Sequence, residues 1–82
     1  MSAEDLERKV AEAESFLPID LQRAVARLTL RQRQVLLLVH VTGMTEEQIA
    51  SAIGVSHQAV NRLLKSSIQK LQKLFLVAVV AK

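Results

Sequence analysis

Apolar residues recur every three to four positions along most of the chain, a spacing that gathers side chains on one face of an α-helix. The 82 residues include only two glycines and one proline, so few positions interrupt a helix. The pattern predicts an all-α fold of four to five helices that ends in a long C-terminal helix. The expected helices span roughly residues 3–17, 20–28, 30–41, 45–53 and 57 to beyond 65.

The first expected helix carries a regular apolar stripe on an otherwise charged surface. The stripe follows intervals of three and four residues and consists of Ala3, Leu6, Val10, Ala13 and Leu17. Pro18 ends this helix. Two heptads are too few for a free-standing coiled coil, so the stripe needs a partner surface. We assign residues 1–18 to an acidic N-terminal helix that serves as a packing or dimerisation arm.

The next two expected helices form the middle of the chain. The first of them, near residues 20–28, turns its leucine and valine side chains inward. The second starts at Thr29, which forms a capping box with Gln32 three residues later. Residues 35–39 of this helix are apolar on nearly all sides, which is typical of a central buried helix.

A short helix, a glycine turn and a second helix follow. The short helix begins with a capping box of Thr45 and Gln48, and the second begins at Ser56, another N-cap. Gly54 follows the last apolar position of the short helix, where a positive φ costs glycine nothing. The two apolar stripes consist of Ile49, Ala50 and Ile53, and of Val60, Leu63 and Leu64. This layout predicts a helix-turn-helix; the alternative is an ordinary pair of packed helices.

The last helix becomes wholly apolar after Lys73. Its tail is much shorter than the ~20 residues of a membrane span, so it needs burial against protein. We assign residues 74–82 to a packing or dimerisation tail and residues 19–73 to the DNA-binding domain. The expected dimer contacts are Leu6, Val10, Leu71 and Phe75.

Two alternatives stay open for these terminal segments. Val77, Val79 and Val80 are β-branched, so a short strand is also compatible with the tail. The stripes at the two ends of the chain share one period and carry opposite charge. They therefore fit each other either within one chain or between two copies, and the excess of apolar surface favours a homodimer.

Charge is divided unevenly along the chain. Residues 1–20 carry six acidic and two basic side chains, a net charge of −4. Residues 21–82 carry nine basic and two acidic side chains, a net charge of +7. The larger, basic part therefore suits a polyanion such as DNA.

The residue inventory argues against an enzyme. Cysteine is absent, and His40 and His57 are the only other soft ligands, so we expect neither a metal nor a cofactor. Both aspartates, Asp5 and Asp20, lie near the N-terminus, where no catalytic cluster can be assembled around them. The N-terminus lacks the basic start and apolar core of a signal peptide. We expect a cytoplasmic protein of bacterial, phage or plasmid origin with no membrane partner.

The second helix of the helix-turn-helix should offer its outward side chains to base edges in the major groove. Gln58 and Asn61 suit adenine, Arg62 suits guanine, and Ala59 suits a thymine methyl group. With His57 they form the expected base-contact set, on a face where we expect no acid; a pH switch is the alternative role of His57. The expected phosphate contacts are Arg31, Arg33, Thr45, Ser56 and Lys65.

From Leu28 to Leu71 the chain resembles the promoter-reading C-terminal region, region 4, of bacterial sigma factors. The matching stretches are LTLRQRQVLLLVHVTGMTEEQIASAIGVS and AVNRLLKSSIQKLQKL. They have the family's arginine-rich helix start, leucine run, glycine before the supporting helix, and Gly-Val-Ser turn. The resemblance implies a helix in the major groove of a promoter element and contact with RNA polymerase. LuxR-type response regulators and TrfB-type plasmid repressors are also similar.

Two differences from sigma factors shape the functional hypothesis. The 27 residues before Leu28 are too few for the other sigma regions, and an apolar tail replaces the family's usual basic run. We therefore expect a homodimeric transcription regulator, most simply a repressor, that binds double-stranded DNA. The alternative is an adaptor that docks on RNA polymerase or on a sigma factor. A third hypothesis is a helical bundle in which the motif arose by chance.

Overall fold

The computed structural model describes the backbone of residues 2–80 and the side chains of residues 2–74. Within this range the chain forms five helices and no strand, which confirms the predicted all-α fold. They are α1 (Ala3–Ser15), α2 (Ile19–Val25), α3 (Leu30–His40), α4 (Glu46–Ile53) and α5 (His57–Val80). The alternative of a strand near the C-terminus is wrong, because α5 continues through Val80. The side chain of Phe75, an expected dimer contact, lies outside the described residues.

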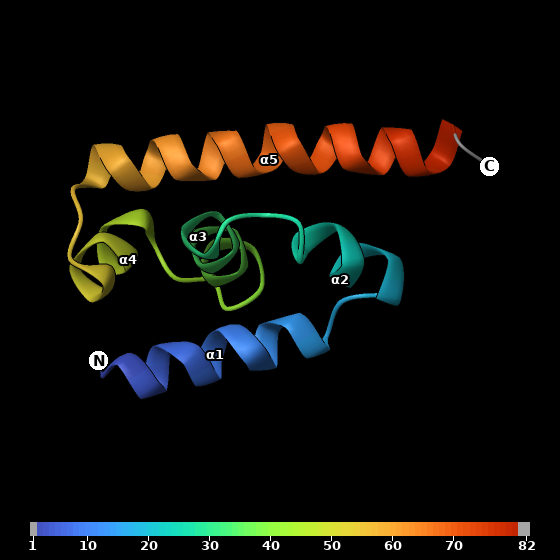
Figure 1. Cartoon of the computed structure of the whole chain (residues 1–82). Coiled ribbons are helices and arrows are strands. Elements are labelled where there is room, and N and C mark those ends of the chain that lie inside the picture. Colours follow the sequence, from blue (N-terminus) through green and yellow to red (C-terminus); the bar gives the residue numbers. More distant parts are fainter. Residues whose placement is uncertain (1, 81–82) are drawn as a thin grey trace.

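The helices form three layers, with α5 on one side, α1 on the opposite side, and α2, α3 and α4 between them (Figure 1). α3 packs against both α1 and α5. The apolar stripes of the two terminal helices therefore pack on opposite sides of α3 and not on each other. The cause is the composition of α3. Four consecutive residues of α3 are buried and supply apolar surface in both directions: Val35, Leu36, Leu37 and Leu38.

The stripe of α1 is used inside the chain. Leu6, Val10 and Ala13 are buried and belong to the single hydrophobic core of the described residues. A polar contact accompanies this packing, since Nε of Arg33 lies 3.2 Å from Oε1 of Glu14. Because Leu6 and Val10 are already covered, a dimer contact through them would require α1 to leave the core.

α1 and α2 end two to three residues earlier than their apolar patterns suggest. At the C-terminal end of each helix, the backbone hydrogen bonds join residues three positions apart instead of four. Examples are the bond from Leu17 N to Glu14 O at 3.1 Å and the bond from Leu28 N to Val25 O at 3.0 Å. This tightening satisfies carbonyl groups that have no partner at the end of an α-helix. Leu17 and Leu28, just past these helices, still reach the core, whereas Phe16 is exposed.

α3 and α4 begin in the same way. Thr29 Oγ1 accepts from the backbone N–H of Gln32 at 3.2 Å, and Gln32 Oε1 accepts from the backbone N–H of Thr29 at 3.0 Å. Thr45 and Gln48 repeat the arrangement at 3.1 and 3.0 Å. Both predicted capping boxes are confirmed. The second one fixes the first turn of α4, which carries Glu46 toward α5.

A buried polar contact joins α3 to α5 and was not expected from the sequence. Ser67 is fully buried, and its hydroxyl lies between the backbone oxygens of Leu63 and Gln32, 3.1 Å from the latter. The side-chain amide of Gln32 donates to Oγ of Ser66 at 3.1 Å. Ser67 lies seven residues after Val60, so its place within the apolar stripe was the signal that it is buried. The contact fixes α5 along the length of α3.

Candidate nucleic-acid interface

A tight turn connects α4 to α5. Gly54 has a φ of 73°, which confirms the predicted left-handed turn, and its N–H donates to the backbone oxygen of Ala50 at 3.0 Å. Ser56 caps α5 by accepting a backbone N–H at 3.0 Å. Val60, one turn into α5, is fully buried in the core. These contacts hold the start of α5 against α4. The face of α5 that lies opposite Val60 stays exposed.

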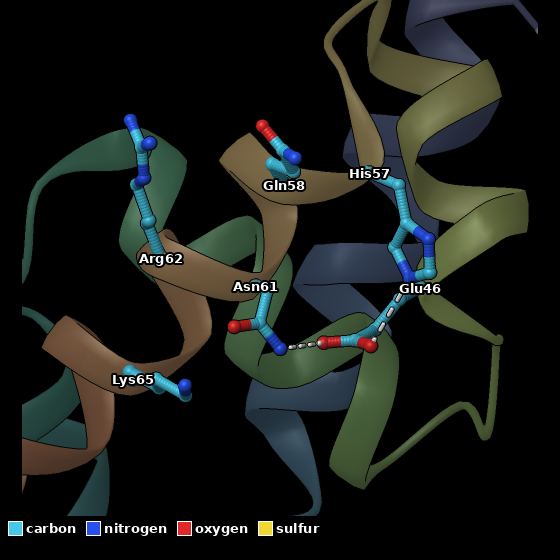
Figure 2. Close-up of a pocket in the computed structure, with 6 residues that line it drawn as sticks. All are labelled: Glu46, His57, Gln58, Asn61, Arg62 and Lys65. Atoms are coloured by element: carbon cyan, nitrogen blue, oxygen red, sulfur yellow. Dashed lines mark hydrogen bonds and ion pairs between the residues drawn. The ribbon is translucent and has the colours of Figure 1, made fainter.

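An open hollow of about 520 Å³ lies over this exposed face (Figure 2). Its lining consists of Glu46, His57, Gln58, Asn61, Arg62 and Lys65. Four of the five expected base-contact residues are thus brought together with Lys65, an expected phosphate contact. Ala59, the fifth, is half-buried and does not line the hollow.

Glu46, the first residue of α4, occupies the edge of this hollow. Its Oε1 accepts a hydrogen bond from Nδ2 of Asn61 at 3.1 Å, and its Oε2 lies 3.3 Å from Nε2 of His57. The expectation that this face carries no acid is therefore wrong. Sequence spacing did not reveal the contact, because Glu46 belongs to the other helix and lies 15 residues before Asn61.

The carboxyl group of Glu46 is held in its charged form. The hydrogen bond from Asn61 lowers its pKa most, followed by the hydrogen bond from His57. The charges of His57 and Lys65 act in the same direction, while partial burial opposes them. The hollow therefore combines one anionic side chain with several hydrogen-bond donors.

The side chains of α5 divide into two rows at this face. Gln58 and Arg62, one turn apart, point away from α4 into open space (Figure 2). His57 and Asn61, also one turn apart, are turned toward Glu46 (Figure 2). The first row is exposed, whereas the second is held by contacts within the protein.

The expected phosphate contacts lie on two different sides of the molecule. Thr45 and Ser56 are exposed N-caps at the starts of α4 and α5, and Lys65 lines the hollow. Arg31 is exposed on α3. Arg33 instead faces α1, where it is paired with an acid. The structure therefore groups three of these five residues around the start of α5.

The chemistry available in the hollow is that of recognition. Amide, guanidinium and ammonium groups match the donors and acceptors of base edges and phosphates. Over the part of the chain that the structure describes, no group of three or more histidine, cysteine, aspartate or glutamate side chains is placed to hold a metal ion. Among the same residues, no helix combines the length and the apolar character needed to cross a membrane.

A capped short helix, a left-handed glycine turn and a second helix with an exposed polar face define a helix-turn-helix protein, a class that inserts its second helix into the major groove of DNA. Residues 19–71 match the family model described as Sigma-70, region 4. The chain belongs to the sigma-70 region 4 family, and its role is DNA-binding and transcription-related. No curated protein and no solved structure matches it. The family match leaves out α1 and the end of α5.

Proposed function

We propose that this protein is a sequence-specific transcription regulator that reads the major groove with the first three turns of α5. The observation that carries this proposal is the pair Gln58 and Arg62, which extends freely from α5 beside two capped helix N-termini. Helix N-termini favour phosphate groups, so DNA bound there brings its base edges to this pair.

Each side chain of the reading face has a matching base or phosphate group. Arg62 suits the O6 and N7 acceptors of guanine, and Gln58 and Asn61 suit the N6 and N7 pair of adenine. His57 and Ala59 lie at the near end of the helix, where a thymine methyl group or a further base edge completes the contact. Phosphates are bound by Thr45, Ser56, Lys65 and the exposed Arg31, while Arg33 would have to leave its contact with α1 first.

The regulator acts as a homodimeric repressor in the cytoplasm of a bacterium. Support for the dimer comes from the sequence of the tail, residues 74–82, which is apolar apart from its last residue. Since Leu6 and Val10 are buried in the core, the dimer contact rests on Leu71, Phe75 and the tail. A bound dimer blocks access to its operator, which is the simplest mode of control for a small protein of this class.

Selection of binding sites from random duplexes, combined with a light-scattering mass, tests this proposal. A homodimer should select a palindrome with half-sites about one helical turn, ~34 Å, apart, and should show twice the mass of the chain. Recovery of no preferred sequence contradicts the DNA-reading function. A single, non-palindromic half-site and the mass of one chain contradict the dimer alone.

A second candidate function is an adaptor that docks on RNA polymerase or on a sigma factor. An apolar groove of about 300 Å³ between α2, α3 and α5 favours it. The groove is lined by Leu17, Leu21, Val25, Leu36, Leu37, His40, Val41, Ile68 and Leu71. Capture of polymerase by the purified protein, blocked by Leu21→Asp and accompanied by no sequence-specific DNA binding, would establish the adaptor in place of the regulator.

A further inference from the structure

The contacts of Glu46 single out one of the base-reading side chains. Glu46 and Asn61 belong to different helices, and Nδ2 of Asn61 lies 3.1 Å from Oε1 of Glu46. Asn61 is half-buried, whereas Gln58 and Arg62 are exposed. The amide of Asn61 is therefore constrained by the protein before any DNA arrives.

The direction of this amide follows from the charge of Glu46. A carboxylate only accepts hydrogen bonds, so it attracts the NH₂ end of the asparagine amide and repels the oxygen end. Oδ1 of Asn61 accordingly points away from Glu46 (Figure 2). One N–H is used by Glu46, and the other N–H and the oxygen remain for a partner.

A free N–H beside a free amide oxygen is what the major-groove edge of adenine requires. Adenine offers the N7 acceptor next to the N6 amine, and an asparagine amide pairs with both at once. An amide that rotated freely would also present two donors toward the N7 and O6 acceptors of guanine. Fixing the amide thus favours adenine before binding, at little further cost in side-chain entropy.

We propose that Glu46 is a positioning residue, which holds the Asn61 amide in one orientation and so gives the reader a preference for adenine at one position of its site. This inference rests on the proposed DNA-reading function. An acidic side chain on a surface that approaches DNA is repelled by the phosphates. The proposed role in specificity gives a reason for its presence there.

The neighbouring acid provides a matched control. Glu47 is exposed, lies in the same first turn of α4, and takes part in neither contact of Glu46. Removing either acid takes one negative charge from the start of the same helix. Only removal of Glu46 also frees the amide of Asn61.

The test measures affinity for the selected duplex and for variants with each other base at the adenine position. The wild type should discriminate by about fivefold or more, the low end for a bidentate side chain at a base pair. Glu46→Ala should reduce this below about twofold at that position alone, whereas Glu47→Ala keeps the preference. Glu46→Gln offers Asn61 a donor as well as an acceptor, so it can hold the amide in either orientation and should keep less discrimination than the wild type. The double variant Glu46→Ala/Asn61→Ala should discriminate between bases about as poorly as Asn61→Ala alone, because Glu46 acts through Asn61.

The outcomes separate this inference from the function on which it rests. If the wild type prefers a sequence but Glu46→Ala and Glu47→Ala shift all affinities equally, Glu46 acts only by its charge and the positioning role is overturned. If the wild type has no preferred sequence, the proposed function fails. Nuclear magnetic resonance of the free protein tests the contact without DNA. In the wild type and in Glu47→Ala, the chemical shifts of the Asn61 side-chain amide protons should differ from those of a solvent-exposed asparagine. In Glu46→Ala they should not differ. A wild-type signal at the solvent-exposed position overturns the inference.

Discussion

The interior around α3 and the reading face of α4 and α5 are built from different kinds of contact. In α3, Val35, Leu37 and Leu38 are almost fully buried and belong to a hydrophobic core that draws apolar residues from all five helices. At the reading face, two hydrogen bonds of one carboxylate hold side chains that lie 11 and 15 residues away. Apolar packing tolerates small changes of direction, whereas a hydrogen bond weakens steeply with angle. The core therefore determines where the helices lie, and the polar contacts determine how the side chains of His57 and Asn61 are oriented.

The largest effect is expected in the interior. Leu38→Ala should destabilise the fold by ~2 to 5 kcal/mol, because Leu38 is fully buried and its truncation leaves a cavity in the core. Urea unfolding followed by circular dichroism measures the loss. Leu30→Ala serves as control, since Leu30 is 59% exposed and its loss should cost less than ~0.5 kcal/mol. Equal losses for the two variants would contradict the placement of α3 at the centre.

The next effect concerns the exposed row of the reading face. Arg62→Ala should weaken binding to the selected duplex by ~1 to 3 kcal/mol and relax one base position, without a change in unfolding free energy. Fluorescence anisotropy against a panel of base substitutions measures both quantities. Lys70→Ala, at an exposed position two turns further along α5, should leave that base preference unchanged. Unchanged affinity of Arg62→Ala would remove Arg62 from the reader.

A smaller effect separates the two capping boxes, which have nearly identical geometry. Thr29→Ala and Thr45→Ala should each cost about 1 kcal/mol of unfolding free energy, and the corresponding serine variants should retain most of it. Only Thr45→Ala should also reduce base discrimination, because it loosens the turn that carries Glu46. Thermal unfolding and the anisotropy panel together test this. A loss of discrimination in Thr29→Ala as well would show that the two regions are coupled.

The smallest effect is a pH dependence of stability. The pKa of Glu46 is lowered in the folded chain, chiefly by the hydrogen bond from Asn61. The charged carboxylate therefore stabilises the fold at pH values above its ordinary pKa of 4.5, and this stabilisation is lost as pH falls through the lowered pKa. The difference in midpoint temperature between wild type and Glu46→Gln should therefore shrink as pH falls from 7 toward 3. Glu47→Gln provides the comparison. A difference from wild type that stays constant across this range would contradict the charged contact.

Local signals in the sequence were sufficient for the five helices and for the capped starts of α3, α4 and α5, whereas α1 and α2 end two to three residues earlier than their apolar patterns suggest. The capping boxes and the turn at Gly54 depend on residues three to five positions apart, so their spacing can be recognised without a structure. The apolar run at 35–39 likewise predicted a central helix, and α3 occupies that place. Of the side chains expected to face outward on α5, Gln58 and Arg62 are exposed, whereas Asn61 is half-buried and contacts Glu46.

Contacts between distant residues were beyond the reach of the sequence. The two terminal stripes share one period and opposite charge, and nothing in either stripe indicates that α3 lies between them. The pairing of Arg33 with Glu14 follows from that placement and turns an expected phosphate contact toward α1. The contact of Glu46 with Asn61 depends on the angle at which α4 meets α5, which is a property of the whole core.

Because α1 packs on α3, the residues that match the family model and the residues that form the hydrophobic core have different boundaries. Residues 19–71 suffice for similarity, yet Leu6, Val10 and Ala13, which precede these residues, are part of the core. Transplanting residues 19–71 alone into another protein would carry over the side chains that line the hollow but expose the side of α3 that α1 covers. A transplant of this helix-turn-helix would therefore have to include α1, or supply a substitute for it.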